Sequence, residues 1–333
     1  MNAYKTYRIL SILMVFMTLG CQDSVEKQEE VFLFSYFKNN GEDGLHLAYS
    51  YDGLKWEALN DDRSFLTPEL SKDKLMRDPC IIKGPDGKFH MVWTVSWEKK
   101  GIGYANSTDL INWSEQLFIP VMQHEESTKN SWAPELFYDE EQEQHLIFWA
   151  STVSDQFLET ANQAEDSWNH RIYYTTTKDF EEFTETEIFV EPGFNVIDAT
   201  IARNESQYFM IIKDETLLPE AQKTLHVLES DNPYNWNVSI SDAISNHWVE
   251  GPTITKIGDE WIVYFDQYRA HQFGAVMSKD LKTWDNISDQ IEFPGGIRHG
   301  TVFKVSKDVL DGLGGMNHSL HPKNKRKRAL FSI

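Results

Sequence analysis

Five short apolar runs of this chain each begin with a side chain that can take part in acid–base chemistry. Four of these side chains are carboxylic acids and the fifth is an imidazole: Asp78, Glu135, Asp198, Glu250 and His299. If they converge, repulsion and burial separate their pKa values, so that one carboxylate is ionised while another keeps its proton. Such a pair can activate water on one side of a bond and protonate a leaving oxygen on the other, which is acid–base hydrolysis.

The spacing of the five groups indicates a repeated unit. They follow one another at intervals of 49 to 63 residues. Repeats of this period stack or arrange themselves radially, because one unit alone cannot bury a core. In each unit the polar-headed run is followed by a turn and a second apolar strand, as in Gly84–Gly87 before Phe89–Thr94. Groups at the same position of every unit are therefore expected to meet.

A second feature recurs five times, after the third strand-like run of each unit. An Asp comes one or two residues after a Ser or Thr, and an aromatic residue comes four or five positions after the Asp. The pairs are Asp52 and Trp56, Asp109 and Trp113, Asp179 and Phe183, Asp231 and Trp236, and Asp280 and Trp284. We expect each Asp to close a turn through its side chain and each aromatic ring to pack between neighbouring sheets.

These elements predict an all-β protein, because strand-sized runs alternate with turn residues and no long segment has the helical period. Five units of about four strands match a five-bladed β-propeller. Residues 31–59 have three strand-like runs without a polar-headed one, and residues 297–305 supply a polar-headed run with nothing after it. The N- and C-terminal strands are therefore expected to pair in one blade and close the ring, with residues 155–170 as an inserted loop or short helix.

Composition narrows the class of partner. The chain has 333 residues, of which 41% are hydrophobic and 13% aromatic, with a net charge of −21. That charge argues against binding nucleic acid or anionic lipid through a broad basic surface. A neutral polar polymer is compatible with it, and the 11 Trp and 13 Tyr residues fit carbohydrate, whose ring faces pack on aromatic side chains.

The termini predict an exported protein. Lys5 and Arg8 precede an apolar run that ends in Gly20-Cys21, which resembles a bacterial lipoprotein signal over residues 1–21. Lipid on Cys21 would be the only membrane contact, residues 22–30 a polar tether, and the location periplasmic or on the outer membrane. An ordinary signal peptide is the alternative. Residues 31–306 would form the propeller and residues 307–333 a C-terminal tail.

The polar-headed motifs, taken in order, resemble those of glycoside hydrolase family 43, whose members are five-bladed propellers. The motifs are Arg77-Asp78-Pro79, Trp132-Ala133-Pro134-Glu135, Ile197-Asp198-Ala199, Glu250-Gly251-Pro252 and His299-Gly300. The resemblance covers roughly residues 31–306. No single motif is specific, but the ordered set is.

This resemblance implies roles for individual residues. Asp78 would be the general base that activates water, Glu250 the general acid, and Asp198 the group that orients Glu250 and raises its pKa. The family inverts anomeric configuration, which needs acid and base on the order of 6.5–9.5 Å apart. His299 resembles the axial histidine of the family, which often lies near a hydrated calcium ion. No cofactor is required, and a structural Ca²⁺ in the channel would be held through water.

The sequence departs from the family pattern in two places. Ala199-Thr200 follow Asp198 where Pro-Ser is common, and Glu135 stands where Asp is frequent. Neither change removes a catalytic acid, but Glu135 would reshape the sugar subsite.

The motifs also contain aromatic and cationic side chains that could contact a sugar. We expect Trp132 and Trp248 to stack on a sugar ring. Arg77 and Arg298 are expected either to bind hydroxyl groups or to pair with the acids.

The resemblance implies an inverting exo-glycoside hydrolase that acts on side chains of plant or algal polysaccharides. We favour an α-L-arabinofuranosidase because the phrases around Arg77 and Trp132 resemble those of exported Bacteroidetes-type enzymes. A β-xylosidase, a β-galactofuranosidase or an exo-galactanase remains an alternative. A non-catalytic surface glycan-binding propeller is the alternative from another class, although it would not need base, modulator and acid together.

Overall fold

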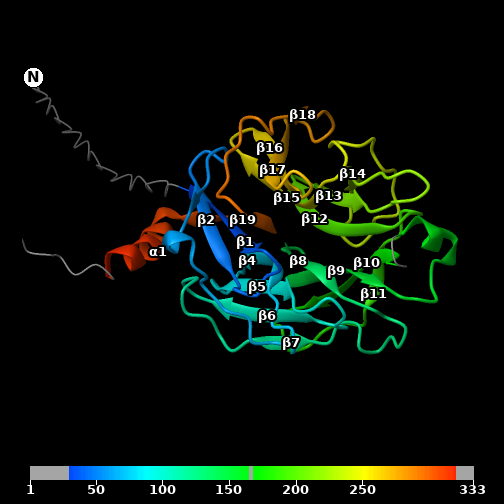
Figure 1. Cartoon of the computed structure of the whole chain (residues 1–333), viewed down its shortest axis with the longest axis horizontal. Coiled ribbons are helices and arrows are strands. Elements are labelled where there is room, and N and C mark those ends of the chain that lie inside the picture. Colours follow the sequence, from blue (N-terminus) through cyan, green and yellow to red (C-terminus); the bar gives the residue numbers. More distant parts are fainter. Residues whose placement is uncertain (1–29, 165–167, 320–333) are drawn as a thin grey trace, which may run out of the picture.

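The computed structural model describes residues 30–164 and 168–319, with side chains as far as residue 314. Within these ranges five antiparallel sheets surround a central axis (Figure 1), so the fold is the predicted five-bladed β-propeller. The innermost strands of neighbouring blades contact one another around the ring.

The blades follow one another along the chain. Within each blade the strands lie side by side from the central axis outward. Blade 1 consists of β19 (Ile297–Ser306), β1 (Glu30–Lys38), β2 (His46–Ser50) and β3 (Glu57–Ala58). Blade 2 consists of β4 (Arg77–Lys83), β5 (Phe89–Thr94), β6 (Ile102–Ser107) and β7 (Leu117–Ile119). Blade 3 consists of β8 (Trp132–Asp139), β9 (Gln144–Thr152), β10 (His170–Thr177) and β11 (Glu187–Val190). Blade 4 consists of β12 (Val196–Asn204), β13 (Gln207–Asp214) and β14 (Thr224–Ser230). Blade 5 consists of β15 (Glu250–Ile257), β16 (Glu260–Gln267), β17 (Gln272–Ser278) and β18 (Asp285–Asn286).

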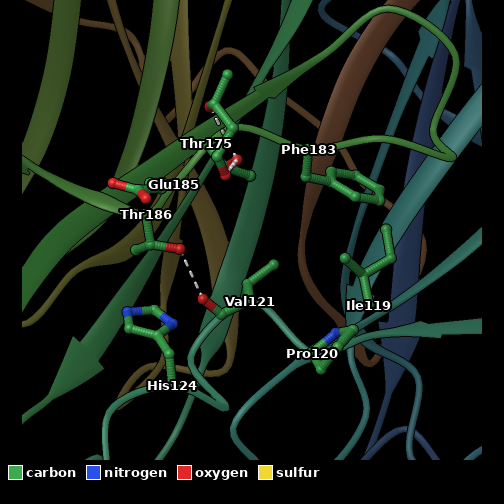
Figure 2. Close-up of a pocket in the computed structure, with 9 residues that line it drawn as sticks. Ile119, Pro120, Val121, His124, Thr175, Phe183, Glu185 and Thr186 are labelled. Atoms are coloured by element: carbon green, nitrogen blue, oxygen red, sulfur yellow. Dashed lines mark hydrogen bonds between the residues drawn. The ribbon is translucent and has the colours of Figure 1, made fainter.

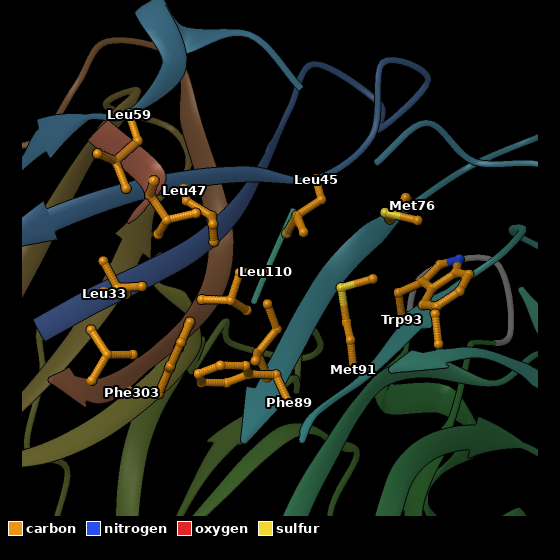
Figure 3. Packing of buried hydrophobic residues seen from close by; sticks show 14 of the residues in the cluster. Leu33, Leu45, Leu47, Leu59, Met76, Phe89, Met91, Trp93, Leu110 and Phe303 are labelled. Atoms are coloured by element: carbon orange, nitrogen blue, oxygen red, sulfur yellow. The ribbon is translucent and has the colours of Figure 1, made fainter. Parts of the chain in front are cut away.

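The second strand of each blade reads as a continuous apolar run because it is covered on both faces. Strand β5, FHMVWT, is buried along its whole length. Figure 3 shows one such interface, where Phe89, Met91 and Trp93 of β5 lie in one cluster with Leu33 and Phe303 of blade 1. The hydrophobic core of the propeller therefore lies between the blades, and the second strand of every blade contributes to it.

The predicted closure of the ring is confirmed. Strand β1 pairs antiparallel with β19, with Leu33 opposite Phe303. Gly300 lies where these strands approach most closely: a Cβ atom built there would lie 1.7 Å from the carbonyl oxygen of Ser35. No side chain fits between them without a backbone shift.

We therefore expect Gly300→Ala to lower the free energy of unfolding by about 3 kcal/mol, the upper range for overpacking a filled site. Urea denaturation followed by circular dichroism measures the change. Gly295→Ala is the matched control, because a Cβ atom there meets nothing within 4 Å. Equal stability of the two variants would contradict this account of the closure.

The Asp–aromatic turns are present as predicted in four units. In each, the Asp Oδ1 accepts backbone N–H groups two and three residues ahead, as Asp52 does from Leu54 at 2.8 Å and Lys55 at 2.9 Å. The prediction for Asp231 is wrong. There Asn232 closes the turn by accepting the N–H of Tyr234 at 2.9 Å, because the turn begins one residue later.

Two connecting segments complete the described chain. The expected insertion contains a short 3₁₀ helix, η2 (Leu158–Gln163), and another 3₁₀ turn, η1 (Asn60–Asp62), follows β3. The sequence assigned residues 307–333 to a tail, but their first part is the helix α1 (Lys307–Ser319). Leu310 and Leu313 lie on one helical face and belong to the same hydrophobic cluster as Leu33 and Phe89, so the helix packs against blades 1 and 2.

Candidate active site

A backbone irregularity recurs at the start of the inner strands. The pairing of inner and second strands shifts register at the polar head of blades 2, 3, 4 and 5. A residue within each shift has positive φ: Asp78 at 51°, Ala133 at 46°, Asp198 at 50° and Gly251 at 59°. Such bulges bend a strand and re-aim its side chains. The recurring bulge thus contains Asp78 and Asp198 themselves, whereas Glu250 directly precedes it and Glu135 follows it.

The bulges bring most of the expected residues to one pocket of about 460 Å³. The sequence-predicted residues that line it are Arg77, Asp78, Trp132, Asp198, Glu250, Arg298 and His299. Further lining residues that the sequence analysis did not assign are Asn39, Asn40, Thr94, Trp97, Ala133, Ile197, Glu215 and Tyr268. The three acids expected to act together thus share one cavity.

Asp78 and His299 form a buried ion pair on one side of the pocket. Asp78 Oδ1 lies 3.3 Å from His299 Nδ1, and Thr94 Oγ1 donates a hydrogen bond to Asp78 Oδ2 at 2.8 Å. Burial alone would raise the pKa of Asp78, but the His299 hydrogen bond and charge lower it to about 2. Burial opposes the charge on His299, but Asp198 and Asp78 raise its pKa to about 9. At neutral pH, Asp78 is therefore ionised and His299 protonated.

Asp198 fixes the backbone beside Glu250. Its Oδ2 accepts the N–H of Gly251 at 2.9 Å, and its side chain is 6% exposed. Burial raises the pKa of Asp198, while the charges of His299 and Lys213 act in the opposite direction. The carboxyl group thus holds the start of strand β15, and with it the position of Glu250.

Glu250 lies between two cations. Arg298 Nη2 donates a hydrogen bond to Glu250 Oε1 at 2.9 Å, and Lys213 Nζ lies 3.6 Å from Glu250 Oε2. Arg298 is itself held by Asp266, whose Oδ2 accepts from Arg298 Nε at 2.6 Å. Burial and the charge of Glu250 raise the pKa of Asp266 to about 6. Of the two roles expected for Arg298, the structure shows pairing with the acids.

Lys213 is the main site residue that sequence reasoning missed. It is 1% exposed, and its Nζ also contacts Glu215 Oε2 at 2.6 Å. Glu215 in turn pairs with Lys223. The available signal was a lysine in the otherwise apolar strand QYFMIIKD, because a buried ammonium group needs a carboxylate partner.

Two expected sugar contacts lie outside the pocket lining. Glu135 is 4% exposed and buried beneath the pocket, where Thr301 and Thr200 donate hydrogen bonds to it at 3.2 and 3.3 Å. The structure therefore does not place Glu135 where a sugar would touch it. The ring of Trp248 packs against the guanidinium group of Arg269 instead, 3.1 Å from ring centroid to Cζ.

Burial raises the pKa of Glu135 to about 8. The folded protein keeps this proton as the pH rises from 4.5 to 8, whereas the unfolded chain releases it, so this group lowers stability over that window. We expect Glu135→Gln to remove this penalty. We compare the unfolding temperature of the variant with that of the unmodified protein. The difference, variant minus unmodified protein, should increase by at least about 2 °C from pH 5 to pH 8.

Thermal unfolding at both pH values measures the difference. Glu220→Gln, at an exposed position, is the control for loss of one negative charge. A difference that stays constant with pH would contradict a protonated Glu135.

The described side chains do not form a direct metal site. No three His, Cys, Asp or Glu side chains among residues 30–164 and 168–314 are grouped so that they could hold a metal ion. Ca²⁺ takes six to eight oxygen ligands, and a protonated His299 cannot serve as a ligand. A water-held calcium near His299 stays a prediction, and no catalytic step below depends on it.

A second pocket of about 470 Å³ lies between blades 2 and 3 (Figure 2). Ile119 and Phe183 supply its apolar walls, and Thr186 Oγ1 donates a hydrogen bond to the Val121 carbonyl at 2.7 Å. Among its lining residues Glu185 is the single carboxylic acid. It therefore lacks the acid–base pair of the pocket at the axis.

The predicted lipoprotein signal, with Cys21, lies outside the described residues, as does the basic run at 323–328. Where the structure is described, no helix is long and apolar enough to cross a membrane.

Comparisons with known proteins identify similar domains and folds. A family model described as a probable glycosyl hydrolase domain, related to family 43, matches residues 28–311. An α-L-arabinofuranosidase of Bifidobacterium longum subsp. longum is 23% identical over 184 residues, which is 49% of this chain and 17% of that relative. The match thus spans less than a fifth of the relative's length.

Solved structures show the same fold. An α-L-arabinofuranosidase from Lactobacillus brevis superposes with a TM-score of 0.51 at 15% identity, over 64% of this chain and 72% of that one. A thermostable family-43 glycoside hydrolase superposes with a TM-score of 0.54 at 15% identity, over 69% and 80% of the two chains.

Proposed function

The chain belongs to the family of glycosyl hydrolase domains related to glycoside hydrolase family 43, and we propose that it is an inverting exo-glycosidase that removes α-L-arabinofuranosyl units. The observation that carries this proposal is the meeting of Asp78, Asp198 and Glu250 in one pocket. Its substrate would be a side chain of a plant or algal polysaccharide. A pocket at the propeller axis suits the terminal sugar of such a branch.

The environments of Asp78 and Asp198 support distinct roles. Asp78 is ionised at neutral pH and can take a proton from water as that water attacks the anomeric carbon. Glu250 would give its proton to the glycosidic oxygen as the bond breaks. Asp198 would act through position, since it holds the backbone of β15 next to Glu250.

Arabinofuranose is proposed as the sugar because two of the similar proteins are α-L-arabinofuranosidases. A panel of 4-nitrophenyl glycosides tests this choice: α-L-arabinofuranoside, β-D-xyloside, β-D-galactofuranoside and β-D-galactoside. We expect release of 4-nitrophenol from the arabinofuranoside. Release from another glycoside of the panel alone would change the proposed sugar specificity, but the protein would still be a glycosidase.

Inversion has its own test. A water activated by Asp78 must attack from the face opposite the leaving oxygen, so the first product should be the β-anomer of the released sugar. Proton NMR in the first minutes, before the anomers equilibrate, distinguishes the two. A first product that keeps the α-configuration would mean that a carboxylate acts as nucleophile instead.

A further inference from the structure

Three tryptophan rings form a row that continues the wall of the active-site pocket outward. Trp97 follows β5, Trp132 begins β8, and Trp168 lies just before β10. The ring centroids of Trp97 and Trp132 are 5.4 Å apart, and those of Trp132 and Trp168 are 4.8 Å apart. Trp97 and Trp132 line the pocket, whereas Trp168 lies beyond it. The aromatic surface is therefore longer than the pocket.

The row is fixed by hydrogen bonds before any ligand arrives. Trp132 Nε1 donates to the Trp97 carbonyl oxygen at 2.9 Å, and Asn195 Nδ2 donates to the Trp168 carbonyl oxygen at 3.0 Å. Cations lie near both outer rings: Arg77 Cζ is 4.4 Å from the centroid of Trp97, and Lys129 Nζ is 5.2 Å from that of Trp168. The row therefore combines apolar ring faces with hydrogen-bond donors.

The segment that carries Trp168 is anchored by a buried arginine. Arg171 is fully buried; its Nη2 donates to Thr160 Oγ1 at 2.8 Å and its Nη1 to Asn169 Oδ1 at 3.2 Å. Its guanidinium group also lies 4.3 Å from the ring centroid of Phe157. These contacts tie both ends of the insertion to blade 3. Backbone held in this way next to Trp168 loses little conformational entropy when a ligand binds.

We propose that Trp168 and Lys129 form a second sugar subsite, which binds the sugar on the leaving-group side of the scissile bond. The inference rests on the proposed function, because an exo-acting pocket holds the terminal sugar and leaves the rest of the polymer to cross this row. Apolar C–H faces of the sugar would pack on Trp168, and Lys129 would donate to a hydroxyl group. The ligand is a neutral oligo- or polysaccharide backbone.

The test compares substrates that do and do not reach the subsite. Trp168→Ala should lower kcat/KM on an arabinofuranose-substituted oligosaccharide by about tenfold, the loss expected for one ring contact. Its kcat/KM on the methyl glycoside of the same sugar, whose leaving group is too small to reach Trp168, should stay within about twofold. Leu158→Ala, at a 67% exposed position on the same insertion, should change neither value. Equal losses on both substrates, or no loss on the oligosaccharide, would overturn the subsite.

A binding measurement keeps this inference separate from the proposed activity. Isothermal titration of arabinan, arabinogalactan and xylan into Glu250→Gln, with and without Trp168→Ala, reports affinity without turnover. We expect Kd for one polymer to weaken by about tenfold when Trp168 is lost. If the unmodified protein hydrolyses nothing but this difference remains, the proposed activity fails and the subsite stands. Equal affinities of the two variants, or binding of no polymer, would remove the subsite.

Discussion

Asp78→Asn should lower kcat by about 10³-fold or more, within the usual range for losing a general base. The amide cannot accept a proton from the attacking water, and the two neighbouring acids have other partners. Asp198 is held by the Gly251 N–H, and Glu250 is paired with Arg298. The measurement is hydrolysis of the preferred aryl glycoside, with active protein quantified by its unfolding transition.

The control for Asp78→Asn must separate chemistry from folding, because the substitution leaves a buried His299 cation without its carboxylate. Added azide offers that control. The azide anion can attack the anomeric carbon itself, while the glycosidic oxygen leaves with the proton of Glu250, which gives a glycosyl azide of inverted configuration. Rescue by azide is expected for a folded protein that lacks only its base. An active Asp78→Asn variant without azide would remove Asp78 from the role.

Glu250→Gln is expected to show the second large loss, and its size should depend on the leaving group. An amide has no acidic proton to give to the departing oxygen. A 4-nitrophenolate leaves with little help, so kcat should fall by about two orders of magnitude on the aryl glycoside. The loss should be greater on an oligosaccharide, whose alkoxide cannot leave unprotonated.

Comparison of the two substrates provides the internal control for Glu250. The Gln side chain can still accept the Arg298 hydrogen bond, so the pocket should keep its shape. If both substrates lose activity by the same factor, Glu250 positions the substrate rather than donating a proton. Activity equal to that of the unmodified protein would exclude either role.

The propeller and the acid triad could be predicted because one physical constraint recurs in the sequence. The inner strands of blades 2 to 5 each carry a bulge near their start; Asp78 and Asp198 lie within it and Glu250 directly precedes it. The closing blade was equally visible, since β1 lacked an inner partner within the N-terminal segment. A residue pattern that the backbone of every blade requires recurs along the chain, and such a repeat can be recognised in a single sequence.

The errors concern features that occur once. Whether Glu135 faces a sugar or lies beneath the pocket depends on Thr200 and Thr301, which come from other blades. The contact of Trp248 with Arg269 likewise depends on packing between loops. Lys213 lies in an apolar strand that was expected to contribute only to the core. Its charge was the one indication that it has a carboxylate partner. Pairings across blades leave no periodic trace, so they could not be predicted from spacing.

Cationic side chains lie next to the acids of the pocket. An ionised Asp78 next to a protonated His299 forms a pair of zero net charge at neutral pH. Burial raises the pKa of Asp198, and Lys213 and Arg298 bracket Glu250. The site thus keeps these three acids close together because the neighbouring cations reduce their mutual repulsion.

The most direct measurement is release of sugar by the unmodified protein and by Glu250→Gln, side by side, on the 4-nitrophenyl panel and on arabinan. The account predicts hydrolysis of the arabinofuranoside by the unmodified protein and a loss of about two orders of magnitude or more in the variant. Folded, unmodified protein that releases nothing from any of these substrates, or a variant as active as its parent, would contradict it.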